Sequence, residues 1–163
     1  MPEPFETHGG TGRKRNSCKA VIVRDNRVLL TLNHSEIGDF YLLPGGGQKW
    51  GETLLQAMRR EVLEETGWIV EPGKIILVRD YIGAHHEFAR TEADVHQTEL
   101  IFLATPVRRE EQPPLPDPWQ TGIEWVSLGR LKSIRIYPSI LNTVLPEIVT
   151  GTYPGPIYLG DVN

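Results

Sequence analysis

Apolar residues recur at two different periods along the chain. Between residues 54 and 66 they return every three or four positions, which is typical of an amphipathic helix. Thr53 is a candidate N-cap and Gly67 a candidate C-terminal stop, so a helix is predicted over Leu54 to Thr66. Three apolar side chains then share the face that we expect to meet the core: Leu55, Met58 and Val62.

Most of the remaining apolar residues lie in short β-rich runs. The runs Cys18–Arg24 and Arg27–Leu32 are joined at Asp25-Asn26, which predicts a hairpin. Further strands are predicted at four places: 40–43, 74–81, 98–104 and 124–128. A second helix is predicted over Ser139 to Val149, where Pro146 is expected to end or kink it. Strands with helices on either side predict an α+β fold, a sandwich around a mixed sheet.

The 163 residues are enough for one domain with a core of its own. Residues 1–16 are rich in glycine and basic residues and are interpreted as a flexible tail, followed by the folded domain 17–150 and a C-terminal tail 151–163. The basic triplet Arg13-Lys14-Arg15 is interpreted as solvated, and a phosphate-facing role is the alternative.

Charge and cysteine content restrict the setting in which we expect the protein to act. The net charge of −4 does not favour non-specific binding of nucleic acid, which needs a basic surface. Cys18 is the only cysteine, so no intrachain disulfide can form. No run resembles a signal peptide or approaches the length of a membrane span. We therefore expect a cytoplasmic protein without a membrane or nucleic-acid partner.

Three carboxylates gather within one turn at the C-terminal end of the predicted helix: Glu61, Glu64 and Glu65. Like charges this close repel one another, and the helix dipole disfavours anions at this end. A compensating cation is therefore expected, and Mg2+ is a candidate because it prefers carboxylate oxygens. An ordinary solvated acidic face is the alternative interpretation.

The segment from Gly46 to Trp68 reads GGQKWGETLLQAMRREVLEETGW. Gly46, then Glu52 six residues later, then the run REVLEETG from Arg60 to Gly67 resemble the signature of the Nudix hydrolases at every fixed position. Trp68 stands where that family usually has an aliphatic residue. A looser resemblance extends from about Cys18 to Val149. It implies an α/β/α sandwich that hydrolyses a nucleoside diphosphate linked to another moiety, with Mg2+ or Mn2+, and it favours a homodimer.

The resemblance also implies roles for single residues. Glu61 and Glu65 would be the main metal ligands, and Glu64 a further ligand or a proton carrier. The carbonyl of Gly45 would complete the coordination of the metal.

Two further pairs of residues have implied roles beside the metal. Glu52 and Arg60 would form a pair that holds the glycine loop, Pro44 to Gly47, against the helix. Gly46 and Gly47 would let the backbone approach the substrate closely.

The general base is expected outside this segment, and three residues are candidates. Glu99 begins a predicted strand, where geometry is held tightly, and its apolar neighbours would raise its pKa toward the range of a base. Asp117 belongs to an acidic loop, together with Glu110 and Glu111, that precedes Glu124-Trp125. We favour Glu99 over Asp117 narrowly, and Glu64 is the third candidate.

The substrate is less well defined by the sequence. A proline typical of ADP-ribose hydrolases would fall near Ala84, and a tyrosine typical of diadenosine polyphosphate hydrolases near His86, and both are absent. Nucleoside triphosphates and nucleotide sugars or alcohols therefore stay as candidates. Four aromatic side chains could stack on a base: Trp50, Tyr81, Phe88 and Trp119.

Two other classes of function compete with the hydrolase. A catalytically silent Nudix domain could bind a nucleotide as a sensor, but the intact signature favours an enzyme. A Nudix isomerase or an mRNA-decapping enzyme is a further candidate, and the net charge does not favour RNA binding. Three histidines, His85, His86 and His96, are expected to be solvated or to face the substrate rather than to bind a transition metal.

Overall fold

A computed structural model describes residues 14–110 and 117–163 of the chain. The expected tail before residue 14 and Glu111 of the acidic loop lie outside these ranges. The described elements are, in chain order, β1 (Lys14–Arg24), β2 (Arg27–Ser35), β3 (Gly38–Leu42), β4 (Gly45–Gly47), α1 (Leu54–Thr66), β5 (Trp68–Ile82), α2 (Ala89–Glu92), β6 (His96–Arg109), β7 (Gln120–Ser127), β8 (Ile136–Tyr137), α3 (Leu141–Thr150) and β9 (Tyr158–Asp161).

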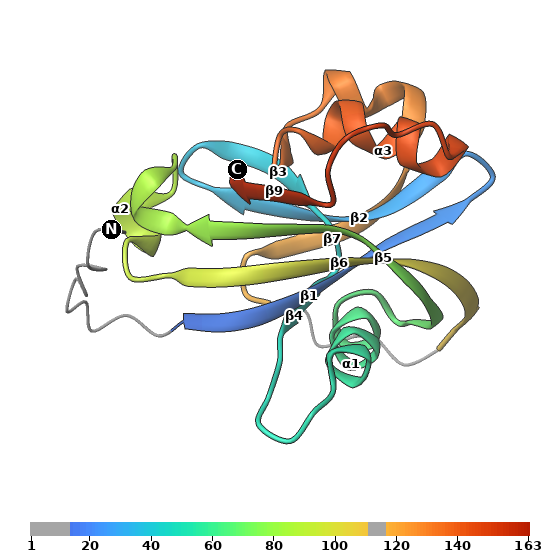
Figure 1. Cartoon of the computed structure of the whole chain (residues 1–163), viewed down its shortest axis with the longest axis horizontal. Helices are drawn as coiled ribbons and strands as arrows, with labels where there is room; N and C mark the ends of the chain where they lie inside the picture. Colours follow the sequence, from blue (N-terminus) through green and yellow to red (C-terminus); the bar gives the residue numbers. More distant parts are fainter. Residues whose placement is uncertain (1–13, 111–116) are drawn as a thin grey trace, which may run out of the picture.

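The strands form one mixed sheet in the order β8-β3-β2-β1-β6-β5-β9, with β4 paired to β1 and β7 paired to β2. The central strand β1 runs parallel to β6 and antiparallel to β2 and β4. Helix α1 covers one face of the sheet and α3 lies over the other (Figure 1). The predicted α+β sandwich with a mixed sheet is therefore confirmed.

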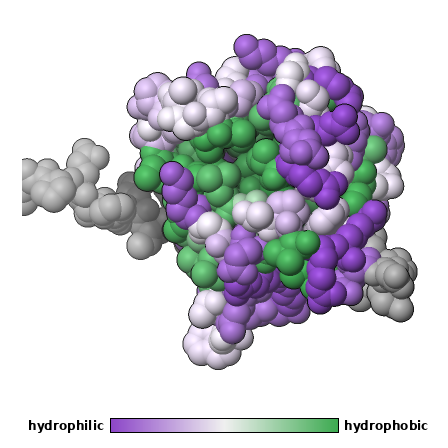
Figure 2. Space-filling view, turned by 90° about the vertical axis from the view of Figure 1, so that its right-hand side faces the viewer, coloured by the Kyte–Doolittle hydropathy of each residue, from purple (hydrophilic) through white to green (hydrophobic). Residues whose placement is uncertain are grey.

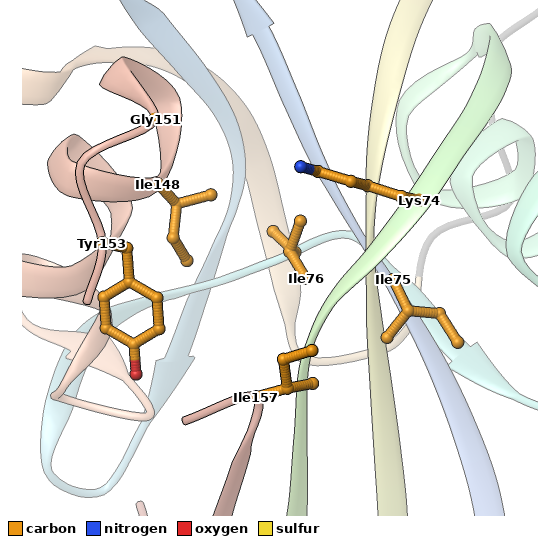
Figure 3. A pocket seen from close by; sticks show the side chains of 7 residues that line it. All are labelled: Lys74, Ile75, Ile76, Ile148, Gly151, Tyr153 and Ile157. Carbon is orange, nitrogen blue, oxygen red and sulfur yellow. The ribbon is translucent and has the colours of Figure 1, made fainter. Parts of the chain in front are cut away.

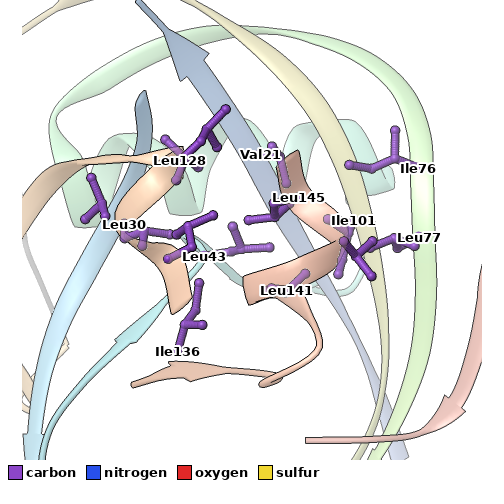
Figure 4. Close-up of a cluster of buried hydrophobic side chains, with 14 residues drawn as sticks. Val21, Leu30, Leu43, Ile76, Leu77, Ile101, Leu128, Ile136, Leu141 and Leu145 are labelled. Atoms are coloured by element: carbon purple, nitrogen blue, oxygen red, sulfur yellow. The ribbon is translucent and has the colours of Figure 1, made fainter. Parts of the chain in front are cut away.

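Each face of the sheet has its own hydrophobic core because side chains alternate along the strands. On the α1 face, Met58 and Val62 belong to the same buried cluster as Ile22 of β1. On the α3 face, Leu141 and Leu145 pack in a cluster around Val21 and Ile101, as Figure 4 shows. Odd-numbered residues of β1 thus face α3, and even-numbered residues face α1.

The local predictions for the hairpin and the first helix are confirmed. Asp25 and Asn26 have φ angles of 50° and 59°, the left-handed conformation of a two-residue hairpin turn. At the start of α1, Thr53 and Gln56 form a reciprocal capping box. At its end, Gly67 has a φ of 73° and donates to the carbonyl of Leu63 at 2.9 Å.

The predicted core face of α1 is wrong at one position. Leu55 is 38 % exposed, whereas Ala57, Met58 and Val62 are buried. Leu54 is partly buried and packs against the same core. A residue advances about 100° around a helix, so Leu55 falls at the edge of the buried stripe on which Leu54 and Met58 are central.

Both predicted tail boundaries need correction. Strand β1 begins at Lys14, because residues 14–16 pair in parallel with residues 96–98 of β6. Within the expected C-terminal tail, β9 pairs in parallel with the outer edge of β5. The amide of Val78 also donates to the carbonyl of Ile157 at 2.8 Å. Residues 14–16 and 158–161 therefore belong to the sheet.

Several other elements are longer or more ordered than predicted. Strands β5 and β6 run for 15 and 14 residues. The connection between them, expected as a loop, contains a 3-10 turn at Gly83–His85 and the short helix α2. Pro146 lies inside α3 without ending it. None of the helices described is long and apolar enough to cross a bilayer.

One apolar hollow lies on the α3 side of the sheet. It has a volume of about 240 Å³ and lies between β5 and the segment that follows α3 (Figure 3). Its lining is mainly aliphatic and includes Ile76, Ile148 and Ile157. Figure 2 shows apolar residues gathered on the face that forms the right-hand side of Figure 1. None of the predicted site residues lines this hollow, so it is separate from the site described next.

Candidate active site

The glycine strand β4 pairs with β1 and contacts the carboxylates of α1. Gly45 has a φ of 135°, and a Cβ there would lie 2.0 Å from the carbonyl oxygen of Cys18. A Cβ on Gly46 would lie 2.6 Å from a carboxylate oxygen of Glu61. A side chain at Gly45 would clash with the backbone of β1, and a side chain at Gly46 would displace the carboxylate of Glu61.

Glu65 is the buried member of the carboxylate group. It is 7 % exposed and accepts a hydrogen bond from the amide of Gly45 at 2.9 Å. Burial raises the pKa of Glu65 to about 7, and the charges of Asp117 and Glu61 add to the rise, while Lys19 and the Gly45 amide oppose it. Glu65 has no ion-pair partner among the residues that the structure describes.

Arg60 connects the glycine loop to the other two carboxylates. Its guanidinium donates to both oxygens of Glu52, at 2.6 and 2.9 Å, and to the carbonyl of Gly47 at 3.0 Å. It also contacts Glu61 at 2.5 Å and Glu64 at 3.4 Å. The hydrogen bonds from Arg60 and from the Lys49 amide lower the pKa of Glu52 to about 2. The predicted Glu52–Arg60 contact is therefore present.

The three α1 carboxylates are close together without forming a closed cage. Within the described ranges, no group of three or more acidic, histidine or cysteine side chains is arranged to hold a metal ion. Arg60 holds Glu61 and Glu64, and Glu65 turns to the Gly45 amide. The donors are nevertheless hard oxygens, and a buried carboxylate without an ion-pair partner suits a divalent cation. These oxygen donors are of the type that Mg2+ prefers, and the three carboxylates would have to turn toward one another to hold it.

The Gly45 carbonyl, a predicted ligand, already has a partner. The ammonium of Lys19 on β1 donates to it at 2.8 Å. For this oxygen to bind a metal, Lys19 must move or share it.

The expected raised pKa of Glu99 is wrong, and its side chain points away from α1. Glu99 is 3 % exposed and shares the strand face of Ile101, which packs in the α3 core, so it does not face α1. Its carboxylate pairs with the Arg79 guanidinium at 2.5 Å. Burial alone would raise the pKa of Glu99, but the charges of Arg79 and Lys19 and the hydrogen bonds outweigh it and lower the pKa.

Asp117, the other base candidate, acts electrostatically on the α1 carboxylates. It is exposed, and its charge contributes to the raised pKa of Glu65. Three residues later, the side-chain amide of Gln120 donates to the Glu65 carbonyl at 2.8 Å. The start of β7 is thus held beside the end of α1.

The aromatic and histidine side chains have varied surroundings. Trp50 is fully exposed and Trp119 is 69 % exposed. Phe88 packs against Phe40 and Tyr137, with ring centroids 5.4 and 5.1 Å apart. These contacts join the connection after β5 to β3 and β8.

Tyr81 is buried and stacks on His86. His85 and His86 both contact the carboxylate of Asp161, at 2.7 and 2.5 Å. His96 lies 3.6 Å from Asp80. The histidines therefore mainly hold the C-terminal strand.

The sequence reasoning missed Lys19 and Gln120 and left Arg15 in the tail. The signal for Lys19 was present in the sequence: the polar residues Ser17 and Lys19 alternate with Cys18 and Ala20 along β1. This period of two places them on one face of the strand.

Comparison with known proteins agrees with this geometry. The family model described as NUDIX domain matches residues 14–145. A MutT NUDIX hydrolase from Burkholderia pseudomallei is 30 % identical, with a TM-score of 0.56 over 72 % of this chain and 85 % of its own. A NUDIX hydrolase from Nitrosomonas europaea is 19 % identical, with a TM-score of 0.71 over 86 % of this chain and 92 % of its own. An ADP-ribose pyrophosphatase from Streptococcus suis is 18 % identical, with a TM-score of 0.57 over 90 % and 97 %.

The chain therefore belongs to the Nudix family, and its domain is that of a Nudix hydrolase. The relatives that are less than 25 % identical share the fold.

Proposed function

We propose that the protein is a Mg2+-dependent hydrolase that cleaves the pyrophosphate linkage of a nucleoside diphosphate joined to another moiety, with Mn2+ as a substitute. The observation that carries this proposal is Glu65, a buried carboxylate with a raised pKa and no ion-pair partner in the described structure, within an intact family signature. A cation beside it would remove the cost of its buried charge.

Glu61, Glu64 and Glu65 would hold the metal, together with the carbonyl of Gly45. Bound there, a divalent ion neutralises phosphate oxygens and lowers the pKa of water. Glu61 lies against Gly46 and Glu65 bonds the amide of Gly45, so both carboxylates reach the same short strand.

Arg60 and Glu52 act on the protein side of the site. Because Arg60 bonds both Glu52 and the Gly47 carbonyl, it holds the glycine loop next to α1. The same guanidinium holds the carboxylates of Glu61 and Glu64 in position. With Gly46 and Gly47 free of side chains, the substrate can approach the backbone closely.

For the general base we propose Asp117. Its charge reaches Glu65, and its exposure leaves it free to take a proton from water. Glu64 is the second candidate, because it is the most exposed of the α1 carboxylates, at 40 %. The buried ion pair with Arg79 makes Glu99 a poor base, since its pKa is lowered.

For the substrate we keep nucleoside triphosphates and nucleotide sugars or alcohols. A screen of these nucleotides with Mg2+, read as phosphate release after phosphatase coupling, tests the proposal. We expect turnover with at least one nucleotide. Glu65→Gln should lower turnover and Mg2+ affinity by about tenfold or more, which is about 1.4 kcal/mol.

Two outcomes would contradict the enzyme assignment. One is normal Mg2+-dependent turnover in Glu65→Gln. The other is nucleotide binding without phosphate release across the screen, which would favour the sensor function instead.

A further inference from the structure

The first half of β1 presents three polar side chains on the face of the sheet opposite to α1. Arg15, Ser17 and Lys19 alternate with residues that face α1. The next two residues of the same series, Val21 and Val23, pack in or against the core under α3. The strand is therefore polar beside the glycine strand and apolar under the helix, which separates a binding surface from the core.

Ser17 is the unexplained residue in this series. It is 1 % exposed, and its hydroxyl has no hydrogen-bond partner among the described residues. Buried hydroxyls almost always have a partner, so a group that completes this one is expected. In the sheet, Ser17 lies between Glu99 of β6 and Gly47 of β4.

The absence of a side chain at Gly47 makes room for Arg15 beside Ser17. Paired residues of neighbouring strands point to the same face. A Cβ on Gly47 would therefore project beside the Ser17 side chain, and it would lie 3.2 Å from the guanidinium of Arg15. Arg15 thus occupies the space that a side chain at position 47 would fill.

Two cations flank Ser17, and both have neutral partners. Lys19 donates to the Gly45 carbonyl at 2.8 Å, and Arg15 donates to the side-chain oxygen of Gln97 at 3.0 Å. Neither forms a salt bridge within the described ranges, whereas the neighbouring Arg79 pairs with Glu99. Arg15 therefore has no anionic partner in the described structure, whereas the charge of Lys19 already acts on the carboxylates of Glu65 and Glu99.

We propose that Arg15, Ser17 and Lys19 form a subsite for a phosphoryl group of the substrate, on the side of β4 opposite to the α1 carboxylates. Two flexible cations and one hydroxyl donor match the several acceptor oxygens of a phosphoryl group. Lys19 already touches Gly45, so the subsite adjoins the metal position. A diphosphate that reached across β4 would meet the carboxylate side with one phosphoryl group and the cations with the other. This inference rests on the proposed function for the identity of the ligand.

Binding of inorganic pyrophosphate, measured by calorimetry in EDTA, tests the subsite without turnover. Wild type should bind, and Arg15→Met and Lys19→Met should each weaken binding about tenfold. Ser17→Ala, which preserves the fold, should weaken it about threefold. Lys14→Met is the matched control: it removes the same charge from the same strand, and this residue belongs to the series that faces α1, so binding should not change.

A second measurement separates a binding role from a general effect on the metal site. For whichever nucleotide is hydrolysed, Ser17→Ala and Arg15→Met should raise KM while their Mn2+ affinity stays that of wild type. The subsite is overturned if wild type fails to bind pyrophosphate. It is also overturned if Arg15→Met and Ser17→Ala bind pyrophosphate as Lys14→Met does, even if hydrolysis is observed. If no nucleotide is hydrolysed but the binding losses appear, the subsite stands and the proposed activity fails.

Discussion

At the scale of single residues, Glu65 shows how the fold changes the chemistry of a carboxyl group. An exposed glutamate is charged at neutral pH, but burial raises the pKa of Glu65 from 4.5 to about 7. A raised carboxyl pKa means that the fold favours the neutral form. The stability that this group contributes is therefore present below pH 4.5 and is lost as the pH rises through 7.

The first prediction follows from this sign. In EDTA at pH 8, Glu65→Gln should be more stable than wild type by on the order of 2 kcal/mol, because the buried charge is removed. At pH 4.5 the difference should vanish, since wild-type Glu65 is then protonated. Urea unfolding at pH 8 and pH 4.5 measures the difference in unfolding free energy at each pH. Glu64→Gln is the control because Glu64 is more exposed than Glu65. An equal gain at both pH values would show that repulsion and burial are not the cause.

Glu99 illustrates the opposite case, in which a buried carboxylate has its own cation. Replacing it with glutamine leaves Arg79 buried without its partner, which should cost about 3 kcal/mol of unfolding free energy.

The pH–rate profile of the folded Glu99→Gln variant should keep its acidic limb, whereas Asp117→Asn should lose this limb with metal affinity retained. Loss of the limb in Glu99→Gln alone would return the base role to Glu99.

At the scale of elements, the position of the glycine loop depends on Arg60. This side chain joins the Gly47 carbonyl to Glu52 on one side and to α1 on the other. Its neighbour Arg59 pairs instead with Glu71 near the surface. The two arginines therefore offer a comparison between a loop-holding contact and an exposed ion pair.

Arg60→Ala should lower kcat by about tenfold or more while divalent-metal binding persists, because the carboxylates remain and only the loop is misplaced. Glu52→Gln should have a smaller effect of the same kind. Arg59→Ala is the control and should be near wild type, since exposed ion pairs contribute little. Calorimetric metal titration together with steady-state kinetics makes the comparison. Metal binding abolished in Arg60→Ala with Glu52→Gln unaffected would contradict this role.

At the scale of the whole molecule, the C-terminal strand closes the outer edge of the sheet. Asp161 accepts from the Ile82 amide at 3.1 Å and contacts His85 and His86. Burial by itself would raise the pKa of Asp161, but the hydrogen bonds from these partners outweigh burial and lower this pKa to about 2. A lowered carboxyl pKa gives stability above pH 3.8 that is lost as the pH falls through 2.

Asp161→Asn should therefore loosen β9 at neutral pH. Amide hydrogen exchange of Val78 and Ile82 should be faster in this variant, while exchange in β1 stays unchanged. Asp39→Asn is the matched control because its histidine partner, His34, is mostly exposed. Equal exchange at Val78 and Ile82 in the two variants would show that Asp161 does not hold the strand.

The sequence by itself determined the local structure and the family. The Asp25-Asn26 turn, the capping box of Thr53 and the Gly67 stop are specified by residues that are adjacent or one helical turn apart. Backbone preferences of this kind act over a few residues, so a short window contains all the information. The α1 carboxylates and the glycine loop could be identified for the same reason, because the spacing from Gly46 to Trp68 lies within one short segment.

Only the tertiary structure decided which charges meet. Glu99 and Arg79 are 20 residues apart, and Lys19 and Gly45 are 26 apart. Strand register determines both contacts, and a shift of one residue would turn each side chain to the opposite face. The same dependence on register places β9 on β5 and sets Arg15, Ser17 and Lys19 beside β4. These contacts join different strands, so no local pattern of residues could have identified which groups meet.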